Sequence, residues 1–259
     1  MSVMLTGATM DLIAVQSSRV ARTRADLALA RGEAVIGGGT WLFSEEQDHV
    51  TGIVDLLGMG WAPVTRSDTT LSIAATCPIA VLRELPDSPL FLQCADSLLA
   101  SWKIQRIATV GGNIALALPA GPMTSLAVAL DADLVLWTST SERRVAAADF
   151  ILGVQSTVLQ PGEVIRSIEI PLASLGQSGF RRIAHSPLGR TGTLVIGRPG
   201  LVTISGGTTR PHQVRFETAD ELIRGIDAIE DWYDDPHGAP DWRRAMSLHF
   251  ALELLDELS

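Results

Sequence analysis

Two glycine clusters constrain this chain more than any other feature. Gly37-Gly38-Gly39-Thr40 follows directly after the short apolar run Ala34–Ile36, and Gly111-Gly112 lies within Thr109–Asn113. Glycine has no Cβ, so its backbone adopts positive φ easily and allows an anion to approach several N–H groups. Each cluster alone is more typical of structure without a ligand: a tight turn for the first, and for the second a helix start capped by Asn113. Together they predict two loops that hold one diphosphate from opposite sides.

The charge balance excludes several partners and reaction types. The chain has 20 Lys+Arg against 29 Asp+Glu, a net charge of −9, which argues against nucleic acid or an anionic membrane as the main partner. Lys103 is the only lysine, and no glycine pattern of a P-loop precedes it. Walker-type hydrolysis, Schiff-base chemistry and kinase-type transfer therefore lack their usual lysine. We expect Lys103 on the surface.

Cysteine, histidine and apolar patterns point to a cytoplasmic chain with no metal site of its own. Cys77 and Cys94 match neither a disulfide scaffold nor a cysteine metal site, so a reducing compartment is expected. The five histidines lack spacing suited to a metal. The apolar stretch Ile114–Leu136 contains prolines and aspartates and predicts no membrane span. The sequence also has no G-x-S-x-G elbow of a hydrolase.

Hydrophobic periodicity predicts an α+β fold. In the first half it predicts a strand over Met10–Val15, a helix from there to Arg31 ended by Gly32, and two short helices within Ile79–Ala100. Further elements are expected up to residue 170: strands Ala34–Ile36, Gly52–Asp55, Thr70–Ala74, Leu134–Trp137, Arg143–Ala146 and Val164–Ile170, and a helix Thr124–Leu130.

An uncharged Ser/Gly-rich stretch, Ala173–Gly179, predicts a loop and a domain boundary. Beyond it we expect a small sheet backed by helices: strands Phe180–Ile183, Thr193–Ile196, Leu201–Ser205 and Gln213–Phe216, then helices Thr218–Ile226 and Asp241–Leu258.

Several segments, in this order, resemble the FAD-binding medium subunit of molybdenum hydroxylases, a family that includes carbon monoxide, nicotine and xanthine dehydrogenases. The segments are Gly37–Leu42, Ile73–Thr76, Ile104–Ala115, Ala129–Ala132, Leu159–Ile165, Phe180–Arg182 and Ile204–Pro211. The resemblance covers nearly the whole chain from about Met10, and the T-V-G-G-N element of Thr109–Asn113 is its most specific part.

The resemblance implies a fold and a set of binding residues. Residues 1–175 would form a two-lobed FAD-binding domain of the vanillyl-alcohol oxidase type, with lobes of about 1–58 and 59–175. Residues 176–259 would form a small α+β C-terminal domain with a three-stranded antiparallel sheet and helices. By the same resemblance, Thr76 would lie near the flavin. The residues implied for the FAD diphosphate and adjacent sugar are Gly37, Gly38, Gly39, Thr40, Trp41, Thr109, Val110, Gly111, Gly112 and Asn113.

The family role implied is electron transfer within a hetero-oligomer, a heterotrimer. A large subunit would carry the molybdenum cofactor and a small subunit two iron-sulfur clusters, from which electrons reach this flavin and then an external acceptor. Two departures leave an alternative open. Pro122 stands where the family commonly has an aspartate, and residues 185–191 lack the aromatic ring that several relatives place near the flavin. A flavin-free scaffold or docking subunit therefore remains the second hypothesis.

Overall fold

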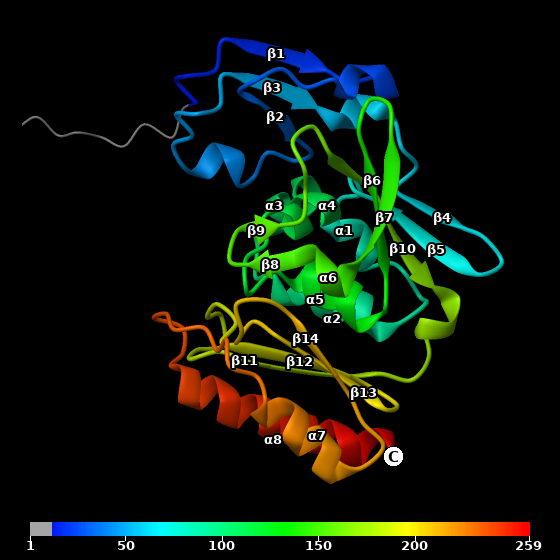
Figure 1. Ribbon diagram of the computed structural model, residues 1–259, viewed down its shortest axis with the longest axis vertical. Coiled ribbons are helices and arrows are strands. Elements are labelled where there is room, and N and C mark those ends of the chain that lie inside the picture. Colours follow the sequence, from blue (N-terminus) through cyan, green and yellow to red (C-terminus); the bar gives the residue numbers. More distant parts are fainter. Residues whose placement is uncertain (1–11) are drawn as a thin grey trace, which may run out of the picture.

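Three principal β-sheets are stacked along the long axis of the molecule in the computed structural model, which describes residues 12–259 (Figure 1). A three-stranded sheet forms one end, a five-stranded sheet with several short helices the middle, and a four-stranded sheet with two helices the other end. The mixed helix and sheet architecture agrees with the predicted α+β class.

The first sheet is parallel, in the order β1-β3-β2. Its strands are β1 (Ser17–Val20), β2 (Glu33–Ile36) and β3 (Gly52–Asp55). Short 3-10 turns occur at Arg24–Leu27, Leu42–Ser44 and Leu56–Met59. The predictions of β2 and β3 are confirmed.

The strand predicted at Met10–Val15 and the helix predicted after it are wrong where the structure describes them. Met10 and Asp11 lie outside the described residues, and residues 12–15 include a turn. The strand lies further along, because Ser17–Val20 pairs with Gly52–Asp55 of β3. Only the single 3-10 turn Arg24–Leu27 remains of the helix.

The middle sheet is antiparallel, in the order β4-β5-β10-β6-β7. Its strands are β4 (Val64–Arg66), β5 (Thr70–Ala74), β6 (Asp133–Trp137), β7 (Glu142–Ala146) and β10 (Val164–Pro171). A small hairpin, β8 (Ile151–Gly153) with β9 (Ser156–Thr157), stands beside it. The helices of this part are α1 (Ile79–Leu82), α2 (Pro89–Ser97), α3 (Trp102–Ile107), α4 (Val110–Ala115), α5 (Pro122–Ala129) and α6 (Ala147–Phe150).

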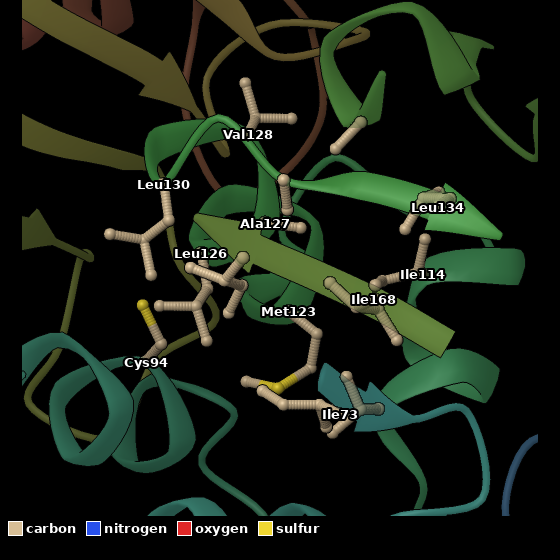
Figure 2. Close-up of a cluster of buried hydrophobic side chains, with 14 of the residues drawn as sticks. Ile73, Cys94, Ile114, Met123, Leu126, Ala127, Val128, Leu130, Leu134 and Ile168 are labelled. Atoms are coloured by element: carbon tan, nitrogen blue, oxygen red, sulfur yellow. The ribbon is translucent and has the colours of Figure 1, made fainter. Parts of the chain in front are cut away.

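Helix α5 is the centre of the core. All eight of its residues are buried, because α2, α4 and α6 contact it and β12 and β13 of the third sheet pack against it as well. Figure 2 shows Met123 and Leu126 of this helix among apolar side chains from the neighbouring strands and helices. Pro122 occupies the first helical position, where its missing N–H costs nothing and its fixed φ suits a helix.

The third sheet is antiparallel and has four strands, in the order β11-β12-β13-β14. Its elements are β11 (Gly179–Ile183), β12 (Thr193–Arg198), β13 (Leu201–Ser205), β14 (His212–Arg215), α7 (Ala219–Asp227) and α8 (Pro240–Leu258). The three-stranded sheet implied by the resemblance is therefore wrong for this chain, because β14 pairs with β13 from Leu201–Arg215 to Ile204–His212. A capping box of Thr218 and Glu221 starts α7.

Asp131 joins the middle and C-terminal parts. It follows α5 with a φ of 50° and accepts hydrogen bonds from Gln213 Nε2 at 2.9 Å, Arg198 Nη1 at 2.7 Å and Arg215 Nη2 at 2.9 Å. Desolvation opposes ionisation, but the bonds from Gln213 and Arg198 outweigh it, and the pKa of Asp131 is lowered. These bonds link the end of α5 to β12 and β14 of the third sheet.

Candidate functional site

A cleft of about 680 Å³ lies where the three parts of the molecule meet. That volume is within the range typical of small-molecule sites. Its lining comes from the loop after β2, the end of α2, the α3–α4 region, the loop before α5 and the connecting segments of the C-terminal part. The lining residues are Val35–Leu42, Ser97–Leu99, Ile104, Ala108, Thr109, Gly112, Asn113, Ala115, Leu116, Leu118–Gly121, Leu188, Arg190, Thr191, Gly206, Tyr233 and Asp235.

The first glycine loop presents free backbone donors to this cleft. Gly39 has a φ of 69°, a conformation that favours glycine, and its carbonyl accepts a hydrogen bond from the N–H of Phe43 at 3.0 Å. Within residues 12–259, the backbone N–H groups from Gly38 to Trp41 donate to no backbone acceptor. Successive free amides of this kind form an anion-binding surface.

Gly37 and Gly38 are needed for a different reason. A Cβ on Gly37 would lie 2.6 Å from Thr109 Oγ1, and a Cβ on Gly38 would lie 1.9 Å from the carbonyl oxygen of Ile107. The loop after β2 therefore packs directly on the α3–α4 junction, and glycine is what permits this contact. The two glycine clusters therefore lie against each other.

The second cluster is the start of helix α4 rather than an open loop. Its N–H groups are satisfied within the chain: Val110 donates to Cys77 O, Gly111 to Ala75 O and Gly112 to Thr109 Oγ1. The cap is Thr109, so the interpretation of Asn113 as the cap is wrong. Asn113 Oδ1 instead accepts from the N–H of Met123 at 3.1 Å, in the first turn of α5.

The predicted binding residues thus fall into two groups. Eight line the cleft: Gly37, Gly38, Gly39, Thr40, Trp41, Thr109, Gly112 and Asn113. Three do not line it: Thr76, Val110 and Gly111. Thr76 and Val110 are buried, and a Cβ on Gly111 would lie 2.4 Å from that of Ala75, so Gly111 serves the packing of α4 on the segment after β5.

Sequence reasoning missed the wall that the C-terminal part contributes. Arg190 is exposed at the cleft, and within the described chain it forms no ion pair, whereas Asp235 is paired with Arg243. Arg190 is therefore the unpaired positive charge of the lining. Arg190 lies in the segment 185–191 that the sequence already singled out, but no local signal marks Tyr233 or Asp235.

Other site types find no support in residues 12–259. No group of three or more His, Cys, Asp or Glu side chains in this range is arranged to hold a metal ion. Nor does any helix described here combine the length and apolar character needed to cross a membrane. Cys77 and Cys94 are both buried, and burial raises the pKa of the Cys77 thiol to about 12, so it is not a thiolate nucleophile.

Comparison with known proteins identifies the family. Residues 14–173 match the family described as the FAD binding domain in molybdopterin dehydrogenase. The chain belongs to this family. Its cofactor is accordingly FAD, and the family is one of oxidoreductase components.

Relatives of known function agree. The chain is 26% identical over 234 residues to xanthine dehydrogenase/oxidase of Rattus norvegicus, an alignment that covers 73% of this chain and 18% of the relative. It is 35% identical over 79 residues to the carbon monoxide dehydrogenase medium chain of Afipia carboxidovorans, covering 30% and 27% of the two chains. This chain thus spans less than a fifth of the xanthine dehydrogenase it matches.

Solved structures share the fold of this chain over a greater part of its length than the sequence alignments cover. A chain in a crystal structure of carbon monoxide dehydrogenase from Hydrogenophaga pseudoflava superimposes with a TM-score of 0.79 at 19% identity, covering 93% of this chain and 96% of that one. For quinoline 2-oxidoreductase of Pseudomonas putida 86 the TM-score is 0.77 at 19% identity, with 93% and 95% covered. At this identity the likeness shows the fold.

The cleft fits the cofactor in its chemistry. FAD has a dianionic diphosphate between two flat ring systems. The free amides from Gly38 to Trp41 and the guanidinium of Arg190 can receive the diphosphate, while apolar side chains such as Leu99 and Ile104 can pack against a ring.

Proposed function

We propose that this chain is the FAD-binding electron-transfer subunit of a molybdenum hydroxylase complex. Bound FAD would take electrons from iron-sulfur clusters and pass them to an external acceptor. The observation that carries the proposal is the first glycine loop, whose unpaired N–H groups face a cleft of suitable volume in a chain of this family.

In this function the chain binds and positions the cofactor. The amides of the loop after β2 would hold the diphosphate, and Thr109, Gly112 and Asn113 would form the adjoining wall. The N–H groups of Gly112 and Asn113 are already used at the start of α4, where they donate to Oγ1 and O of Thr109. Arg190 would add a mobile positive charge at the rim. No side chain acts as general acid or base, because the redox chemistry belongs to the cofactor. The buried residues Thr76, Val110 and Gly111 would act through packing beneath the site.

We further propose the assembly and the domain arrangement. The partners are a small iron-sulfur subunit and a large subunit with the molybdenum cofactor, in a cytoplasmic heterotrimer; Cys77 and Cys94, free and buried, suit a reducing compartment. The domain limits proposed are 1–175, with lobes of about 1–58 and 59–175 in a vanillyl-alcohol oxidase type of arrangement, and 176–259. Their support is the separate sheet within each part.

The test measures how much FAD the chain binds and whether binding depends on the diphosphate of FAD. The full chain, alone and co-expressed with its partner subunits, should carry one FAD per chain, seen by visible absorbance and by release on denaturation. ADP should compete with FAD, whereas riboflavin, which has no phosphate, should not. Stable complexes with no flavin would refute the proposal and support the scaffold alternative.

One argument for the flavin-free alternative is weakened by the fold. Pro122 is buried at the first position of α5, where proline is favoured, and it is not among the residues that line the cleft. The substitution of aspartate by proline at this position therefore leaves the loop amides and Arg190 in place for the diphosphate.

A further inference from the structure

Residues 231–238, which connect α7 to α8, supply an aromatic ring to the cleft. Tyr233, the only tyrosine of the chain, and Asp235 both line it. The segment is fastened to the residues after β13: Thr209 N–H donates to Asp231 O at 3.0 Å and Tyr233 N–H donates to Gly207 O at 2.9 Å. Thr208 and Trp232 also form a β-bridge.

A buried arginine holds this wall in shape. Arg243, in the first turn of α8, is fully buried, and its guanidinium donates to Gly206 O at 2.7 Å, to Gly238 O at 2.8 Å and to Asp235 Oδ1. The centre of the guanidinium lies 5.6 Å from the Tyr233 ring centroid, within the range of a cation–π contact. Two of its three acceptors, Gly206 and Asp235, line the cleft themselves.

Tyr233 belongs to the same corner of the cleft as segment 185–191. A Cβ on Gly206 would lie 3.0 Å from Thr191 Cγ2, so the residues after β13 abut this segment. His185 also stacks on Trp242, next to Arg243, with ring centroids 4.9 Å apart. Segment 185–191 brings Leu188, Arg190 and Thr191 to the cleft but no benzenoid ring.

We propose that Tyr233 is the ring that contacts the isoalloxazine of FAD in this chain, with Arg243 as its positioning residue. The inference rests on the proposed function. The C-terminal part thereby provides the aromatic contact that segment 185–191 lacks. Tyrosine is suited to this position because its ring adds contact area while only two side-chain torsions are fixed.

Because Trp41 also lines the cleft, the experiment compares Tyr233→Phe, Tyr233→Leu and Tyr233→Trp in a Trp41→Phe background, which serves as the wild type of the series. The FAD-loaded full chain or complex is used, with Phe216→Leu as control. Phe216 is a partly buried aromatic of the same part of the chain, and it does not line the cleft. Tyrosine and tryptophan quench flavin emission on contact by donating an electron, and phenylalanine does not. The two readouts are the fluorescence lifetime of bound FAD and its Kd.

We expect Tyr233→Trp to stay quenched, and Tyr233→Phe to lengthen the lifetime several-fold while its Kd stays near that of the wild type. Tyr233→Leu should lengthen the lifetime and raise the Kd of FAD about two- to tenfold, the loss of affinity expected when one aromatic stacking contact is removed. Phe216→Leu should change neither. If FAD binds and the lifetime is the same in Tyr233→Phe, the inference is wrong while the proposed function stands. If the wild type binds no FAD, both fail.

Discussion

Replacing Gly38 and Gly112 by alanine separates the two reasons for glycine at this site. At Gly38 the new Cβ would lie 1.9 Å from the Ile107 carbonyl oxygen, about 1.1 Å short of the 3.0 Å that real Cβ contacts respect, and the obstacle is backbone. The loop after β2 must therefore move off the α3–α4 junction. Such overpacking costs about 1–3 kcal/mol, which lowers the Tm by roughly 2–4 °C per kcal/mol in a chain of this size.

Gly112 is different because its Cβ would meet only the Thr109 hydroxyl, at 2.8 Å, and otherwise open space at the cleft. Alanine there must displace the Thr109 hydroxyl by a few tenths of an ångström, a cost offset by the preference for alanine over glycine in a helix, up to about 1 kcal/mol, so the stability of the apo chain should change little. In the proposed binding mode the methyl group would nevertheless occupy space that FAD needs, because Gly112 lines the cleft. We expect Gly38→Ala to lower both Tm and FAD affinity, and Gly112→Ala to lower FAD affinity alone.

The measurements are thermal unfolding of the apo chain by circular dichroism and FAD binding by calorimetry. Gly176→Ala is the matched control, because its Cβ would have no neighbour within 4 Å and its φ is not positive. Wild-type stability in Gly38→Ala would refute the packing of the two glycine clusters described above. Wild-type affinity in Gly112→Ala would remove Gly112 from the binding surface.

Three further changes have definite outcomes. Arg190→Gln should raise the Kd of FAD by up to about tenfold in titrations at low salt, with less effect at high salt, because an exposed charge is screened. Hydrogen bonds from Arg19, at 2.8 Å, lower the pKa of Glu33 from 4.5 to about 2. The Glu33 carboxylate therefore stabilises the fold above pH 4.5, and this contribution is lost as the pH falls toward 2. Between pH 4.5 and pH 2, the Tm of Glu33→Gln should vary less with pH than that of the wild type. Met123→Ala should destabilise the chain by about 2–5 kcal/mol in urea unfolding, whereas Ile13→Ala, at a side chain that is 74% exposed, should change stability by less than about 0.5 kcal/mol.

Short apolar runs next to turn residues made most strands predictable. The bounds of strands β2, β3, β5 and β11 to β14 lie within two residues of their predicted positions. The failure at the start of the chain has a tertiary cause. Residues 17–20 are Ser-Ser-Arg-Val, which shows no polar–apolar alternation and is followed by alanines at helical spacing. Pairing with β3 makes them a strand.

At the cleft, local pattern found the loop after β2 and the start of α4, because glycine clusters are visible in sequence. The sequence pattern did not show which backbone amides are free. Whether an amide is free depends on tertiary contacts: the carbonyl oxygens of Ala75 and Cys77, distant in sequence, accept hydrogen bonds from the N–H groups of Gly111 and Val110. The sequence did not reveal Tyr233 for a related reason: its segment reaches the cleft through tertiary contacts of the C-terminal part, such as those of β12 and β13 with α5 and the hydrogen bond from Gly206 N–H to Pro119 O.

The contact between Gly37 and Thr109 also bears on how such a site can change over generations. Because a Cβ at position 37 would collide with the Thr109 side chain, a substitution at one position alters what the other tolerates. Effects of changes at residues in contact do not add. Among descendants of this sequence, an alanine at 37 should persist mainly where 109 has become smaller, so the two positions should be inherited as a pair.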